Sequence, residues 1–158
     1  MTATISRPKI SNWETSNIPN LTGKTALITG ANSGLGYYTA KALAEKNAHV
    51  VIACRSLEKA NQTIKKLKGL NPEGIFTPLE LDLSDLKNVV EVQSKIFDDF
   101  ENLDLLINNA GIMHPPKTLS AQGYEIQFAV NHLAHMLLTL KLLPIIEKKE
   151  ESRIVTVT

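Results

Sequence analysis

The chain has 158 residues, of which 43% are hydrophobic and 21% are charged. This length is typical of one domain, and the composition is ordinary for a soluble globular protein. The formal net charge of +1 provides no electrostatic footprint for nucleic acid or for an anionic membrane surface. The single cysteine, Cys54, excludes an internal disulfide and fits a reducing compartment.

Residues 1–20 are predicted to form an N-terminal arm on the surface, with Trp13 as its packing anchor. They lack the apolar run of a secretory signal peptide, so a cytoplasmic location is expected. The most hydrophobic stretch is residues 126–146. Five polar side chains make a membrane span costly there and favour a buried core helix: Gln127, Asn131, His132, His135 and Lys141.

From residue 21 onward, short apolar segments typical of strands alternate with segments of helical spacing. Strands are predicted at residues 24–29, 49–54, 76–82, 103–108 and 153–158. Helices are predicted at residues 35–46, 57–67, 84–100 and 122–146. This alternation predicts right-handed βαβ units and a Rossmann-type α/β fold, which is a doubly wound parallel sheet in the order 3-2-1-4-5. The ligand crevice is expected beyond the carboxyl ends of strands one and four.

The segment TGANSGLG, residues 29–36, contains the strongest functional motif of the chain. Gly30 permits a tight turn, Gly34 lets the backbone approach a pyrophosphate, and Gly36 allows close packing of helix on strand. Free N–H groups and the dipole at the helix start favour phosphate charge. A simple tight turn is the alternative, but the strand–turn–helix context favours a dinucleotide site. The residues assigned to this loop are Gly30, Asn32, Ser33, Gly34, Leu35 and Gly36.

The end of the second strand indicates which dinucleotide is bound. An NAD site usually places an acidic residue about twenty positions beyond the glycines, where it holds the ribose hydroxyls. This chain has Arg55 and Ser56 there. A guanidinium can pair with a 2′-phosphate, so NADP(H) is predicted over NAD(H). The alternative interpretation makes Arg55 an ordinary surface residue at a strand end.

Successive segments of the chain resemble those of one enzyme family from Ile18 onward. The matching segments are IPNLTGKTALITGANSGLGYYTAKALA, VIACRS, LDLSDL, LDLLINNAGIM, FAVNHLAHMLLTLKLLP and RIVTVT. They resemble the short-chain dehydrogenase/reductase family, in its retinol-dehydrogenase-like branch, which includes WW-domain oxidoreductases. The light-dependent protochlorophyllide reductases share the GLG and ACR segments and are a more distant match, with protochlorophyllide as an alternative substrate.

The resemblance implies roles for further residues. Asp82 and Leu83 would contact the adenine, and the backbone of Asn109, Ala110 and Gly111 would lie under the cofactor. Read alone, the segment NNAG, residues 108–111, could be a polar turn after a strand.

Asn131 would hold a water of the proton relay, and a hydrogen-bonded core asparagine is the competing interpretation. His132 and His135 lack a third ligand at a recognisable spacing, so no metal site is predicted.

In the family, the strand matching residues 153–158 leads to a catalytic serine and then to a Tyr-x-x-x-Lys pair, which this chain lacks at that place. Tyr37 and Lys41 have the spacing but follow the glycine loop, so they are not assigned catalysis. The chain is therefore expected to be the cofactor-binding part, residues 21–158, of an NADP(H)-dependent oxidoreductase for a small carbonyl or alcohol, incomplete at its C-terminus.

Two alternatives are a non-catalytic dinucleotide-binding or regulatory protein, and a doubly wound fold for another ligand such as a methyl donor. The apolar edge of the fifth strand is expected to be exposed and to favour self-association.

Overall fold

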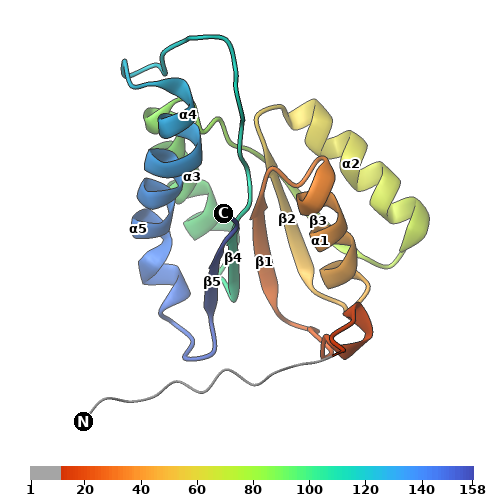
Figure 1. Cartoon of the computed structure of the whole chain (residues 1–158). Helices are drawn as coiled ribbons and strands as arrows, with labels where there is room; N and C mark the ends of the chain where they lie inside the picture. Colours follow the sequence, from red (N-terminus) through yellow and green to blue (C-terminus); the bar gives the residue numbers. More distant parts are fainter. Residues whose placement is uncertain (1–11) are drawn as a thin grey trace.

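The computed structural model describes residues 12–158, which contain a five-stranded sheet in the order β3-β2-β1-β4-β5 (Figure 1). Neighbouring strands pair in parallel throughout. This confirms the predicted fold and strand order. The strands are β1 (Thr25–Thr29), β2 (His49–Cys54), β3 (Ile75–Glu80), β4 (Leu105–Asn108) and β5 (Arg153–Thr156).

Helices cover both faces of the sheet, as Figure 1 shows. On one face lie α1 (Gly34–Ala44) and α2 (Leu57–Leu70), and on the other lie α3 (Leu86–Asp99) and α5 (Ala134–Ile146). In β1, Leu27 packs toward α3 and α5, whereas Ala26 and Ile28 pack toward α1 and α2. Because both faces of the strand are buried, the sequence of β1 is continuously apolar and does not alternate.

The two edge strands differ in exposure. At one edge, β3 contains Pro78, which an edge strand tolerates because one side of its ladder is free. At the other edge, all four residues of β5 are exposed, including Ile154 at 40% and Val155 at 45%. The predicted exposure of the fifth strand is therefore confirmed.

The long apolar helix begins later than the sequence pattern predicts. Residues 121–124 form turns and bends, with Gly123 at φ +82°, and Glu125 forms an isolated β-bridge with Leu119. The Glu125 carboxylate accepts hydrogen bonds from the N–H groups of Gln127 and Phe128. The helix then consists of α4 (Ile126–Phe128), a π-helical turn η2 (Ala129–Leu133), and α5. Ile126–Ile146 could cross a membrane by length and composition, and 44% of its most apolar window is buried inside the fold. Ala134, Leu138 and Leu142 of this helix belong to the hydrophobic core.

Only residues 12–20 of the predicted N-terminal arm are described, and residues 1–11 lie outside the described part. A short 3-10 turn, η1 (Thr15–Asn17), precedes β1. The Lys46 ammonium donates to the Ser16 carbonyl at 3.0 Å and ties this segment to the turn after α1. The prediction for Trp13 is wrong, because its side chain is 54% exposed and does not anchor the segment.

Candidate functional site

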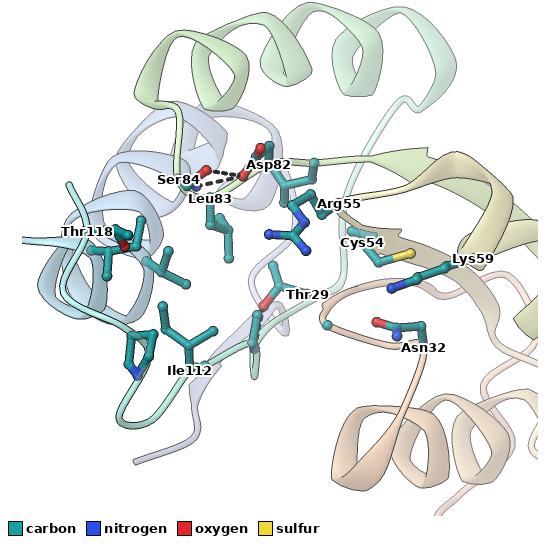
Figure 2. A pocket seen from close by; sticks show the side chains of 18 residues that line it. Thr29, Asn32, Cys54, Arg55, Lys59, Asp82, Leu83, Ser84, Ile112 and Thr118 are labelled. Atoms are coloured by element: carbon teal, nitrogen blue, oxygen red, sulfur yellow. Dashed lines mark hydrogen bonds between the residues drawn. The ribbon is translucent and has the colours of Figure 1, made fainter. Parts of the chain in front are cut away.

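A pocket of about 470 Å³ lies at the carboxyl ends of the central strands, where the loops after β1, β2, β3 and β4 meet (Figure 2). This is the edge at which a doubly wound sheet changes direction and binds ligands. Seven of the residues predicted from the sequence line the pocket: Gly30, Asn32, Arg55, Asp82, Leu83, Ala110 and Gly111. Seven other predicted residues do not line it: Ser33, Gly34, Leu35, Gly36, Ser56, Asn109 and Asn131.

The glycine loop packs tightly against the loop that follows β4. Gly30 has φ +65°, and a Cβ added there would lie 2.9 Å from the Ala110 Cα. A Cβ at Gly36 would lie 2.5 Å from both the Gly30 carbonyl oxygen and the side-chain nitrogen Nδ2 of Asn109. Any larger residue would therefore separate the two loops or displace the start of α1. The predicted close packing at Gly36 is thus present, but its nearest atoms belong to loop residues and not to a strand.

The start of α1 is open, unlike the starts of α2 and α3. Ser33 occupies the N-cap position but makes no side-chain capping hydrogen bond, and Gly34, at φ +54°, has open space where a Cβ would lie. By contrast, Ser56 caps α2 and Asp85 caps α3 through side-chain hydrogen bonds. First-turn N–H groups without a side-chain cap can bind an anion at the positive end of the helix dipole.

Two cationic side chains line the pocket beyond the end of β2. Arg55 follows the strand directly, and Lys59 lies in the first turn of α2. In Figure 2 Lys59 lies beside Asn32, and the Arg55 side chain points into the middle of the pocket, between Leu83 and Thr29. Sequence reasoning missed Lys59, and helical spacing does not link it to Arg55, because Arg55 precedes Ser56, the N-cap of α2. Cys54 also lines the pocket, and burial raises the pKa of its thiol, which keeps it uncharged at neutral pH.

Asp82 and Leu83 close the pocket on the side of β3. The strand ends at Glu80, two residues earlier than predicted, because Asp82 forms a turn of its own. Its carboxylate accepts hydrogen bonds from the Ser84 amide at 2.9 Å and the Ser84 hydroxyl at 2.6 Å. This Asx-type turn directs the chain into α3 and holds Leu83, which is 6% exposed, at the pocket wall.

The NNAG loop is bound to the end of β1 through Thr29. The Thr29 hydroxyl oxygen accepts hydrogen bonds from the amides of Asn109 and Ala110, both at 2.9 Å. The Asn109 side chain in turn donates to the Thr29 carbonyl at 2.9 Å. Asn109 therefore lies behind the pocket as a brace, while Ala110 and Gly111 form its wall.

Asn131 lies in the π-helical turn η2, and its side chain hydrogen-bonds to both backbone groups of Ile112, a residue that lines the pocket. Its Nδ2 donates to the Ile112 carbonyl at 2.8 Å, and its Oδ1 accepts from the Ile112 amide at 2.9 Å. The expectation of a buried amide is wrong, because Asn131 is exposed. Single π-helical turns are frequent at functional sites, and here the turn presents Asn131 to the loop after β4.

The two histidines of this helix have different environments. His132 is exposed and stacks on Phe128, with ring centroids 5.4 Å apart. His135 is 5% exposed and its Nε2 lies 2.9 Å from the Thr29 hydroxyl. Among residues 12–158 there is no group of three or more side chains that could hold a metal ion.

A sequence model of the short chain dehydrogenases matches residues 24–158 of the chain. The chain belongs to the short-chain dehydrogenase family. It is retinol-dehydrogenase-like within that family, being 40% identical over 136 residues to human retinol dehydrogenase 13, with 86% of this chain and 41% of the human protein covered.

Solved structures of other proteins share the fold of this chain. A protein from Mycobacterium paratuberculosis superposes with a TM-score of 0.75 at 40% identity, covering 85% of this chain and 47% of its own. The NADP complex of RhlG from Pseudomonas aeruginosa superposes with a TM-score of 0.74 at 26% identity, covering 87% and 55%. Other solved members with this fold hold NADP or NAD. The chain thus spans about half the length of the solved relatives and about two fifths of the human one.

Proposed function

We propose that this short-chain dehydrogenase binds NADP(H) in the pocket at the carboxyl ends of β1, β2 and β4. The observation that carries the proposal is the pair of cations, Arg55 and Lys59, lining the pocket where an NAD-binding member would place an acidic side chain. A guanidinium and an ammonium can both pair with a 2′-phosphate, whereas neither gains much from a neutral 2′-hydroxyl.

The rest of the pocket lining, and the start of α1 beside the pocket, fit the other parts of a dinucleotide. The side-chain-uncapped start of α1, with open space in front of Gly34, suits the pyrophosphate. Leu83 offers an apolar surface for the adenine, and the small residues Ala110 and Gly111 leave room for the cofactor on the side of β4.

We further propose that the whole protein reduces a small carbonyl compound or oxidises the corresponding alcohol. NADPH would supply the hydride for the reduction, and NADP+ would accept it in the oxidation. The chain's own residues bind the cofactor, and Asn131 occupies the position that the family resemblance assigns to a proton relay. The resemblance also assigns proton donation to a tyrosine that follows the segment matching β5, and the tyrosines of this chain are Tyr37, Tyr38 and Tyr124. None of these occupies that position.

Cofactor binding is tested by titrating the purified chain with NADPH and with NADH, followed by nicotinamide fluorescence. Saturable NADPH binding with much weaker NADH binding is expected. Arg55→Ala and Lys59→Ala should each weaken NADPH binding about 10- to 100-fold, the range for a hydrogen bond to a charged group, and leave NADH binding unchanged.

Lys65→Ala provides the matched control, because Lys65 is an exposed lysine of the same helix that does not line the pocket. Equal losses for NADPH and NADH would contradict pairing with the 2′-phosphate. Absence of binding by a folded, monodisperse sample would contradict the proposal as a whole. NADPH binding without hydride transfer to any carbonyl would favour the alternative of a non-catalytic dinucleotide-binding protein.

A further inference from the structure

We infer that His135 is a positioning residue of the pocket, whose neutral side chain joins the end of β1, the NNAG loop and the π-helical turn through one chain of hydrogen bonds. The inference rests on the proposed function in one respect, namely that the pocket it supports is the one that binds NADP(H). Sequence spacing alone marks His135 only as a packing or helix-face residue.

The direction of the hydrogen bonds follows from counting donors and acceptors at Thr29. A hydroxyl group has one proton to donate and two lone pairs that accept. The amides of Asn109 and Ala110 both donate to the Thr29 oxygen and occupy those lone pairs. The hydroxyl proton must therefore be donated, and its nearer acceptor is Nε2 of His135 at 2.9 Å, whereas the Ile107 carbonyl lies at 3.4 Å.

This direction determines the tautomer of His135. Because Nε2 accepts, it carries no proton, and the proton of the neutral ring lies on Nδ1. The Nδ1 atom lies 3.3 Å from the Asn131 carbonyl oxygen, which can accept it. The His135 side chain thus connects Thr29, 106 positions earlier in the chain, to the backbone of Asn131 in the π-helical turn.

The surroundings of His135 favour the neutral ring that this arrangement requires. Burial lowers the pKa of His135 below its ordinary value, and the hydrogen bond to the Asn131 carbonyl opposes this effect only in part. The groups in hydrogen-bonding contact with the ring are the Thr29 hydroxyl from β1 and the Asn131 carbonyl from η2. Within residues 12–158, no charged side chain contributes to the shift.

Protonation would break the chain of bonds at a defined atom. A charged ring carries protons on both nitrogens, so Nε2 could no longer accept from Thr29. The Nε2–H group would then point at the Thr29 hydroxyl, whose own proton would lose its acceptor. The hydrogen bonds that Thr29 accepts from the Asn109 and Ala110 amides would be disturbed. The affinity for NADPH should therefore fall as the pH drops through the pKa of His135, which burial places below the ordinary histidine value of 6.5.

The first test is the histidine tautomer in the wild-type chain, read from long-range ¹H–¹⁵N correlations of the ring nitrogens at pH 7.5. A neutral ring with its proton on Nδ1 is expected for His135. A proton on Nε2, or a charged ring at that pH, would overturn the inference without any variant or ligand.

The second test compares three variants by NADPH titration and by the amide signals of Asn109 and Ala110. His135→Leu removes the acceptor and should weaken NADPH binding about tenfold, the effect of one lost hydrogen bond, while both amide signals shift. His135→Gln keeps a non-titrating acceptor, so it should restore affinity and abolish the pH dependence. His132→Gln, at the exposed neighbouring histidine, should match the wild type in every measurement.

The outcomes separate the two proposals. If His135→Leu folds, keeps wild-type amide signals and keeps wild-type affinity, His135 does not position the pocket. If the folded wild type binds no NADPH, the proposed function fails, and the tautomer and the amide signals still decide the role of His135. If His135→Gln behaves like His135→Leu, the acceptor role is contradicted and only the volume of the ring matters.

Discussion

At the scale of single residues, Gly30 is the most constrained position of the pocket. Its φ of +65° lies in the left-handed region, and its missing Cβ leaves room for the Ala110 backbone. Two independent requirements, one conformational and one steric, therefore select glycine there. Gly69 lies in α2, has a negative φ, and has no atom within 4 Å of an added Cβ, so neither requirement applies to it.

This contrast predicts opposite effects of the same substitution. Gly30→Ala should lower the free energy of unfolding by at least about 2 kcal/mol, since a left-handed alanine costs 1–2 kcal/mol and the contact with Ala110 adds to it. Gly69→Ala should raise it by about 0.5–1 kcal/mol, the gain for glycine to alanine inside a helix. Urea unfolding followed by circular dichroism measures both. Equal effects of the two substitutions would show that neither requirement acts at Gly30.

At the scale of elements, Asp104 joins three strands at their amino-terminal ends, on the side of the sheet away from the pocket. Its carboxylate accepts from the Thr25 amide at 2.9 Å and pairs with the Lys24 ammonium at 3.0 Å. Its carbonyl accepts from the Arg153 amide at 2.9 Å, so the residue before β4 contacts the starts of both β1 and β5. The side chain is only 4% exposed, which makes this polar contact part of the interior.

Asp104→Asn should lower the free energy of unfolding by about 1–3 kcal/mol, because Lys24 and Lys149 both lose the Asp104 charge while the amide can still accept from Thr25. The loss should stay below that of a fully buried pair, because the Lys24 side chain is 33% exposed and solvent screens it. Urea unfolding at low and high salt measures the effect, which should shrink at high salt. Asp98→Asn, at an exposed position of α3, is the matched control. A salt-independent loss would assign the effect to hydrogen bonding and not to charge.

At the scale of the whole molecule, the two edges of the sheet differ in their readiness to pair. The edge strand β3 contains Pro78, which cannot donate to a ladder, and ends at the exposed Glu80. The edge strand β5 is exposed along its whole length and carries Ile154 and Val155. An exposed apolar edge strand is a template for pairing with another chain, so self-association is expected to involve β5.

A lysine on this edge should therefore reduce association, because a charge at a strand edge opposes edge-to-edge pairing. Sedimentation velocity of the 158-residue chain over a range of concentrations should show association for the wild type and a shift toward monomer for Val155→Lys. Val90→Lys, at a 40% exposed valine of α3, controls for added charge alone. Association that persists in Val155→Lys, or a monomeric wild type, would contradict a role for β5.

The sequence by itself determined the strand order, the positions of the main elements and the pocket loops. These features depend on local patterns: continuous apolar strands, helical spacing, and glycines between a strand and a helix, each of which reflects backbone geometry and burial over a few residues. The boundaries that differ are those where a side chain rebuilds a local turn, as Asp82 does after β3 and Glu125 does before α4. The pattern of hydrophobic residues contains no signal for such turns.

The tertiary structure alone decided which distant residues meet. The hydrogen bond between Thr29 and His135, the two bonds between Asn131 and Ile112, and the exposure of Asn131 depend on how η2 and α5 pack against the loops of the sheet. Such contacts require a match within a few tenths of an ångström between segments far apart in the chain. Residue type and spacing report what each segment does locally, and only packing brings the buried His135 to the Thr29 hydroxyl.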